Sequence, residues 1–140
     1  MLEHYEPDFD PERFIKVFMT QTGVTAEKTA LMILRRKIPK ESFFQDRVKK
    51  ALKKSYPQAF IRKISQGVGS EGGTPDLMMI LDGHYFGFEI KRPVVGELKG
   101  LQREVIRQIG AAKGTAAVVR WPEEAIAIVE GWRSHEASHA

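Results

Sequence analysis

The pattern of hydrophobic and polar positions predicts helices in the first third of this 140-residue chain. Apolar positions recur with helical spacing from residue 11 to residue 22. Asp10 can cap the start of this helix and Pro11 suits its first turn, while Gly23 is expected to end it. Thr25 is expected to cap a second helix that runs to about Lys37.

The pattern changes to short apolar runs after a third predicted helix at residues 40–55. The buried stripe expected on that helix is Phe43, Phe44, Val48, Ala51 and Leu52. Strands are predicted over residues 59–64, 76–81, 84–91 and 115–120, the last of them fully buried. A glycine-rich loop is predicted at residues 66–73.

Two more helices are predicted in the second half of the chain. The apolar residues of the first are Leu98, Leu101, Val105, Ile106 and Ile109. This helix is expected to end at Gly110 or Gly114. The second opens at Pro122 and turns Ala125, Ile126, Val129 and Trp132 inward. The tail 133–140 is expected to be disordered.

The dipeptide Asp82-Gly83 is a strong signal for a two-residue hairpin between the second and third strands. Side chains alternate along a strand, so Glu89 and Lys91 share one face of the second hairpin strand. The element order predicts an α/β domain with a mixed sheet of about four strands flanked by helices. Residues 1–39 form an additional helical N-terminal segment, and residues 40–132 form the main domain.

Composition and charge narrow the possible functions. The chain has no cysteine, which excludes disulfides and thiolate sites, and its apolar runs are too short to span a membrane. With an acidic N-terminus unlike a signal peptide, an intracellular soluble protein is expected. The net charge is +4, and residues 35–54 hold nine bases against two acids. Such a basic segment is typical of a phosphate-binding surface, although a solvated helix face is an equal alternative.

Several polar residues around the hairpin have the chemistry of a metal-dependent hydrolase. Asp76 and Glu89 are candidate ligands for a hard cation such as Mg²⁺, and the carbonyl of Ile90 could add a third oxygen. Lys91 could orient a water molecule or offset charge on a phosphate.

The helices before and after the hairpin supply two further candidate residues for the metal site. Glu41 near the start of the third helix could reach the metal, and Gln102 on the helix after the hairpin could hydrogen-bond water or phosphate. Each feature alone is more often structural, because Glu-x-Lys on a strand is usually an exposed ion pair. The combination is what favours a catalytic site.

These residues carry a specific resemblance. The segments Gly73-Thr74-Pro75-Asp76-Leu77, Phe88-Glu89-Ile90-Lys91-Arg92-Pro93 and Gly96-x-Leu98-x-x-x-Gln102 resemble the virus-type replication–repair nuclease (VRR-NUC) domain. That family belongs to the PD-(D/E)xK superfamily, which has a restriction-endonuclease-like core. The resemblance covers roughly residues 40–121, and it includes every motif element in order. Residues 1–39 have no counterpart in it.

The resemblance implies a metal-dependent DNA endonuclease with Mg²⁺ or Mn²⁺. It implies catalytic roles for Asp76, Glu89, Lys91 and Gln102, and metal binding by Glu41, Asp76 and Glu89. The Ile90 carbonyl is a further candidate metal ligand because of its position next to Glu89. Branched DNA such as a Holliday junction is the expected substrate, and a homodimer in the cytoplasm of a bacterial or phage-infected cell is the expected form. Arg47, Lys49, Lys50, Lys53 and Lys54 are the predicted DNA-binding residues. A nuclease of linear duplex, sequence-specific or general, and a non-catalytic DNA-binding module are the alternatives.

Overall fold

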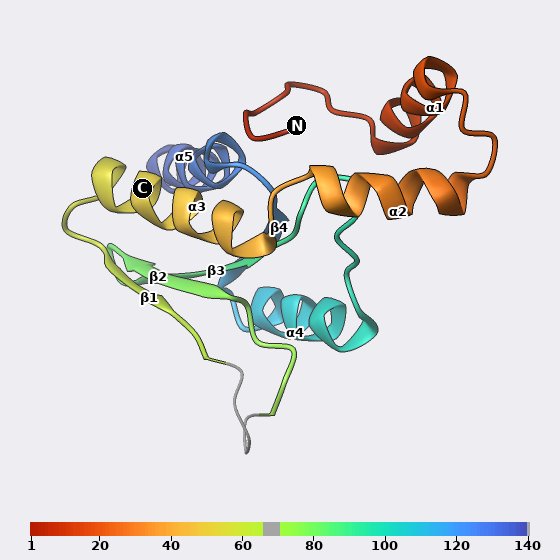
Figure 1. The fold of residues 1–140 in the computed structure, drawn as a ribbon. Coiled ribbons are helices and arrows are strands. Elements are labelled where there is room, and N and C mark those ends of the chain that lie inside the picture. Colours follow the sequence, from red (N-terminus) through yellow and green to blue (C-terminus); the bar gives the residue numbers. More distant parts are fainter. Residues whose placement is uncertain (66–70, 140) are drawn as a thin grey trace.

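The computed structural model describes residues 1–65 and 71–139, and these form one sheet with flanking helices (Figure 1). The elements follow in the order α1 (Pro11–Thr22), α2 (Glu27–Lys37), α3 (Glu41–Ser55), β1 (Phe60–Lys63), β2 (Leu77–Leu81), β3 (His84–Ile90), α4 (Gly100–Ala111), β4 (Thr115–Val119) and α5 (Pro122–Ser138). This arrangement confirms the predicted α/β class and the mixed sheet of four strands.

The sheet has the strand order β1-β2-β3-β4, with two antiparallel pairs followed by a parallel pair. The turn between β2 and β3 is the predicted hairpin, because Asp82 and Gly83 both have positive φ angles, of 52° and 77°. A two-residue turn with two positive φ angles matches the twist of the flanking strands. The parallel β3–β4 pair needs a crossover, and α4 provides it.

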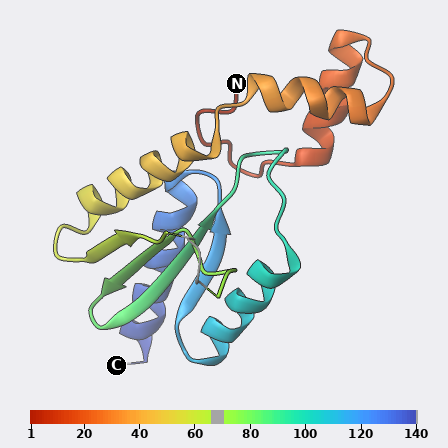
Figure 2. The ribbon, with the colours of Figure 1, turned by 60° about the horizontal axis from the view of Figure 1, so that its bottom comes forward.

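Helices α3 and α5 cover one face of the sheet, and α4 lies against the opposite face beside β3 and β4 (Figure 2). The main core lies on the α3–α5 face. Its buried members from the strands are Ile61, Leu77, Met79, Leu81, Phe86, Phe88, Ile90 and Val119. These pack against the buried side chains of α3 and α5, which are Phe44, Val48, Leu52, Ala125 and Val129. Burial of this apolar area is the main stabilising term of the domain.

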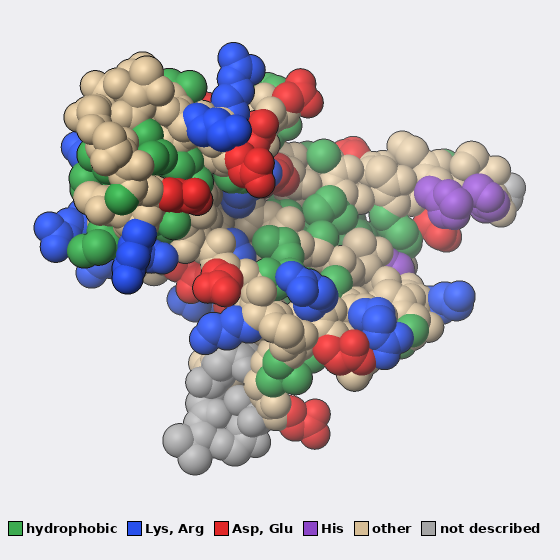
Figure 3. Space-filling model, turned by 90° about the vertical axis from the view of Figure 1, so that its right-hand side faces the viewer, with side chains coloured by type: hydrophobic (Ala, Val, Ile, Leu, Met, Phe, Trp, Pro, Cys, Tyr) green, Lys and Arg blue, Asp and Glu red, His purple; other side chains and the backbone are tan. Residues whose placement is uncertain are grey.

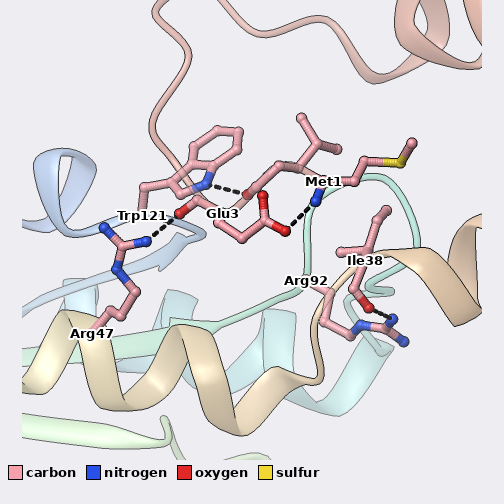
Figure 4. Close-up of polar contacts among 7 residues, drawn as sticks. Met1, Glu3, Ile38, Arg47, Arg92 and Trp121 are labelled. Carbon is pink, nitrogen blue, oxygen red and sulfur yellow. Dashed lines mark hydrogen bonds and ion pairs between the residues drawn. The ribbon is translucent and has the colours of Figure 1, made fainter.

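The first nine residues contain no helix or strand, and Glu3 lies close to Trp121, the residue just before α5 (Figure 4). Leu2 is buried, and its carbonyl accepts a hydrogen bond of 2.9 Å from Nε1 of Trp121. Arg47 on α3 donates to the Glu3 carbonyl at 2.5 Å. Beyond this segment, α1 and α2 pack on each other as a helical hairpin that projects past the sheet (Figure 1). Residues 1–39 are thus tied to the domain at both ends.

The ends of α1 match the prediction, whereas the start of α2 does not. Asp10 accepts hydrogen bonds from the backbone of Glu12 and Arg13, and Gly23 ends the helix with a φ of 74°. The α2 helix begins after Ala26, and no side chain caps it, so the predicted Thr25 cap is wrong. The free backbone N–H groups of that first turn face solvent, where water can satisfy them.

Three further expectations need correction. Phe43 is 36% exposed, and the polar Gln45 is buried in its place on α3. Strand β4 is an edge strand rather than a fully buried one, because Val118 is 39% exposed. The tail expected to be disordered is helical, since α5 continues to Ser138.

The predicted glycine-rich loop lies partly outside the described residues, which resume at residue 71. Within the described ranges, no helix combines the length and the apolar character that a membrane crossing requires.

Candidate active site

Five elements meet at one end of the sheet, and each brings a polar residue there. Strand β1 ends where β2 begins, as Lys63 pairs with Leu77, and β3 ends beside the start of β2. Helices α3 and α4 both begin close to this end, with Glu41 as the first residue of α3 and Gln102 as the third of α4. The order of elements therefore gathers side chains that are distant in sequence.

Asp76 is fixed between two strands. Its carboxylate Oδ2 accepts a hydrogen bond of 2.9 Å from the Ile90 backbone N–H, and its carbonyl accepts one of 2.8 Å from Ile64. The preceding Pro75 is buried against Gly87 on β3, where an added Cβ would lie 2.8 Å from the proline ring. Gly87 therefore allows the close approach that sets the position of Asp76.

Glu89 is the buried carboxylate of the site, with only 1% of its surface exposed. Oε1 accepts a hydrogen bond of 3.0 Å from Nε2 of Gln102 and lies 3.6 Å from Nζ of Lys91. Oε2 is buried and has no hydrogen-bond partner among the described residues. A buried carboxylate oxygen without a partner costs free energy, so this atom is suited to a ligand.

The electrostatics of Glu89 follow from its surroundings. Burial raises the pKa of its carboxyl group to about 8, and the negative charge of Asp76 adds to the rise against the opposing effect of Lys91. Two carboxylates close together in a poorly solvated place cannot both ionise easily. A cation that neutralises them would remove this conflict.

Gln102 uses both ends of its amide. While Nε2 donates to Glu89, Oε1 accepts a hydrogen bond of 3.0 Å from the Lys99 backbone N–H at the start of α4. The side chain thereby fixes the orientation of the Glu89 carboxylate relative to the helix.

Glu41 lies at the edge of this cluster. Burial raises the pKa of its carboxyl group, and the charge of Asp76 adds to the rise, while Lys91, Arg92 and Lys63 act in the opposite direction. Among the described residues, no group of three or more acidic or histidine side chains is gathered closely enough to hold one metal ion. The structure thus brings Asp76 and Glu89 together, and it places Glu41 within electrostatic range of them.

These donors fit a hard divalent cation. Two carboxylates, one of them with an unpartnered oxygen, are typical ligands for Mg²⁺ or Mn²⁺. Mg²⁺ in particular commonly keeps several waters and takes only one or two protein carboxylates. Asp76 and Glu89 are the residues that would hold such an ion, with the Ile90 carbonyl and Glu41 as further candidates.

Sequence reasoning missed the role of Arg92, which follows Lys91. Its guanidinium donates to three carbonyls at the α2–α3 junction, at 2.8 Å to Pro39, 2.7 Å to Arg35 and 2.7 Å to Ile38. Figure 4 shows the bond to Ile38. These bonds fix the backbone just before Glu41 to the strand end that carries Lys91. The acceptors are more than 50 residues away in sequence, so no local pattern could have indicated them.

The predicted DNA-binding residues on α3 are not part of this cluster. Arg47 is occupied by the Glu3 carbonyl and lies over the Phe43 ring, with 5.4 Å to the centroid. Lys50, Lys53 and Lys54 are exposed, and Lys49 is half-buried. At a rise of 1.5 Å per residue, these four lysines lie about 12 to 20 Å along the helix from Glu41.

Two hollows in the protein surface differ in their position relative to the site. One of about 330 Å³ opens beside Lys91 and is lined by Pro11, Lys91, Arg92, Val94, Gly96, Leu98, Val118 and Arg120. A larger hollow of about 410 Å³ lies among residues 6–17 and contains none of the clustered site residues. The smaller one is the more relevant to chemistry, because it borders a site residue.

No protein-family model and no curated protein matches the sequence. A solved structure described as a VRR_NUC domain matches with a TM-score of 0.50 and 24% sequence identity. The match covers 61% of this chain and 92% of that chain. The chain therefore contains the fold of a VRR-NUC domain, as the resemblance in sequence predicted.

Proposed function

We propose that this protein is a metal-dependent DNA endonuclease that hydrolyses phosphodiester bonds. The observation that carries the proposal is the buried Glu89 carboxylate, whose free oxygen lies in a cluster with Asp76, Lys91 and Gln102. A buried acid beside a half-buried acid and an amine is costly for stability and is suited to holding a cation at a phosphate. The VRR-NUC fold supports the same reaction class.

Each site residue has a role that follows from its contacts. When bound by Asp76 and Glu89, Mg²⁺ or Mn²⁺ would polarise the scissile phosphate and lower the pKa of an attacking water. Gln102 holds the Glu89 carboxylate in place through its Nε2 hydrogen bond. Lys91 supplies a positive charge that offsets the charge developing on the phosphate, or orients the water.

The remaining ligands are also part of the proposal. Glu41 interacts electrostatically with Asp76 and enters from the first turn of α3. The Ile90 carbonyl follows Glu89 directly, and the Ile90 N–H is already bonded to Asp76. Both are proposed as additional oxygen ligands.

Branched DNA such as a four-way junction is the proposed substrate, and a homodimer is the proposed active form. One active site cuts one strand, so paired cuts in a symmetric junction require two subunits related by a two-fold axis. The lysines on α3, namely Lys49, Lys50, Lys53 and Lys54, are proposed to attract the phosphate backbone together with Arg47. Their distance from Glu41 along the helix favours a role in attraction rather than in chemistry.

The experiment is cleavage of a labelled synthetic four-way junction, with linear duplex and single-stranded DNA in parallel. Each is incubated with Mg²⁺, with Mn²⁺ or with EDTA. Paired, metal-dependent cuts in the junction alone are expected. Cutting of every substrate would indicate a general nuclease, and discrete bands from linear duplex a sequence-specific one. Tight junction binding without any cutting would indicate a non-catalytic module.

A further inference from the structure

Exposed cations stand next to the residues that build the site. Lys40 directly precedes Glu41 at the start of α3. Lys63 ends β1 opposite Leu77, the residue after Asp76. Both lysines are exposed, so their ammonium groups can meet a ligand that approaches the site.

The same arrangement recurs on the other side of the site. Lys99 precedes α4, and its backbone N–H is bonded to Oε1 of Gln102. Arg35 lies in the last turn of α2, and its carbonyl accepts one of the hydrogen bonds of Arg92. The Arg92 contacts hold the α2–α3 junction at the strand end that carries the site.

These four cations form no ion pair within the described part of the chain, although Lys63 lies within electrostatic range of Glu41. The ion pairs found there engage the N-terminus, Lys91, Arg107, Arg120 and Arg133. None of them involves Arg35, Lys40, Lys63 or Lys99. Figure 3, which faces the α2 side of the molecule, shows Lys and Arg side chains on the helical hairpin and below it, with acidic side chains among them.

A cluster of acids creates a problem for any enzyme that acts on DNA. Without compensation, Asp76, Glu89 and Glu41 would repel the phosphates that flank the bond to be cut. Exposed cations around the acids would make the electrostatic potential at the edge of the site positive. The acids themselves would remain free to bind a metal ion. A cation lies beside each segment that carries a site residue, and these cations can offset the repulsion between the acids and the phosphates.

We propose that Arg35, Lys40, Lys63 and Lys99 form a phosphate-binding rim around the site, which holds the DNA backbone on both sides of the scissile bond. This rests on the proposed nuclease function and identifies the surface that receives the substrate. The four side chains come from α2, the α2–α3 junction, β1 and the start of α4. The DNA backbone bound by these four side chains would therefore cross the end of the sheet and would not run along α3.

The rim differs in role from the lysines of α3. Lys50, Lys53 and Lys54 are carried away from the site by the rise of the helix, and they can act on DNA only at a distance. The rim residues adjoin the acids and are expected to contact phosphates directly. Direct contacts release bound counterions, which makes the affinity depend on salt.

The test compares two triple variants that remove the same charge. The rim variant combines Lys40→Gln, Lys63→Gln and Lys99→Gln. The control combines Lys16→Gln, Lys28→Gln and Lys113→Gln, three exposed lysines with no proposed part in DNA binding. Binding of a short fluorescein-labelled duplex and of a four-way junction is measured by anisotropy in EDTA over a range of KCl concentrations. Circular dichroism and thermal melting check that both variants are folded.

The slope of log K against log salt concentration is expected to shrink by about 3 in the rim variant, near 0.9 for each lost contact. The control is expected to change it by less than about 1. Equal slopes for the two variants, or a larger reduction of the slope in the control, would overturn the proposal of a phosphate-binding rim.

Cleavage assays with Mg²⁺ and Mn²⁺ separate this proposal from the nuclease function. If the wild-type protein never cuts DNA but the rim variant still loses its salt slope, the nuclease function fails and the rim stands. If the wild-type protein cuts and the rim variant binds as the control does, only the rim fails. A wild-type protein that does not bind DNA overturns both.

Discussion

Two aspartates bracket β2, and they have opposite environments. Asp76, just before the strand, accepts a hydrogen bond from Ile90 and lies in the cluster that contains the buried Glu89. Asp82, just after the strand, is exposed in the hairpin turn and has an ion pair of 3.7 Å with Arg133, whose side chain is 41% exposed. One residue type thus occupies both ends of a five-residue strand with very different chemistry.

The difference lies in what converges at each end. At the Asp76 end, two helices begin and two neighbouring strands end, so polar groups are forced together away from water. At the Asp82 end, a two-residue turn projects into solvent, and its charge is screened. Charges that interact strongly need low exposure, so the topology rather than the residue type decides which aspartate can hold a metal.

The largest expected effect tests this contrast directly. Asp76→Asn should lower the cleavage rate by at least about 100-fold. Even residues that only hydrogen-bond to a metal ligand typically change metal affinity or activity by about 10- to 100-fold when mutated, and Asp76 is proposed as a ligand itself. Asp82→Asn, the matched control, should leave the rate unchanged. Initial rates with Mg²⁺ on the preferred DNA give the comparison, and anisotropy in EDTA should show similar DNA binding for both. Full activity of Asp76→Asn would refute the site.

A second prediction concerns the charge that holds the Asp76 end together. Arg92→Ala leaves three carbonyls of the α2–α3 junction without their donor, so the free energy of unfolding should fall by about 2–3 kcal/mol. Arg36→Ala, an exposed arginine in the last turn of α2, should change it by less than about 0.5 kcal/mol. Urea denaturation of both variants measures this. Equal stabilities would show that the junction does not depend on Arg92.

The site could be predicted from sequence where its parts are local. The hairpin signal fixes the spacing of Asp76 and Glu89, because two strands joined by a two-residue turn have only one register that buries the apolar face. The contacts of Arg92 span more than 50 residues, and the hydrogen bond from Trp121 to Leu2 spans 119. Such pairs depend on how the helices pack, which no local pattern encodes.

Helix faces and chain ends were also predicted less well than the hairpin. Phe43 was expected in the apolar stripe of α3 but is exposed, whereas the polar Gln45, which was not expected there, is buried. The tail was expected to be disordered because it is a chain end, yet α5 continues as a helix to Ser138. A hydrophobic stripe thus indicates that a helix exists more reliably than where it ends.

A third prediction uses the acid that faces Asp76. Burial and the charge of Asp76 raise the pKa of Glu89 to about 8 in the folded protein, against an ordinary value of 4.5. The folded state binds this proton more tightly, so its stabilising effect is complete below about pH 4.5 and is lost as the pH rises through about 8. In EDTA, the free energy of unfolding should therefore fall as the pH rises across this window.

Glu89→Gln removes this titration and keeps the shape of the side chain. Urea midpoints in EDTA should be nearly flat for the variant across the same pH window, whereas those of the wild-type protein should decline. A wild-type decline that persists unchanged in Glu89→Gln would assign it to other groups. Added Mg²⁺ should offset the loss at high pH only in the wild-type protein, because the ion binds the ionised carboxylate.

The smallest expected effect belongs to the Asp82 end. Asp82→Asn removes the charge that pairs with Arg133 but keeps a residue that tolerates the positive φ of this turn. The variant therefore isolates the ion pair from backbone strain, which Asp82→Ala would not do. Between two exposed side chains the pair should contribute less than about 0.5 kcal/mol, and the difference should vanish in high salt. A loss above about 1 kcal/mol in urea denaturation would mean that this end is coupled more tightly than its exposure implies, and the contrast between the two aspartates would then weaken.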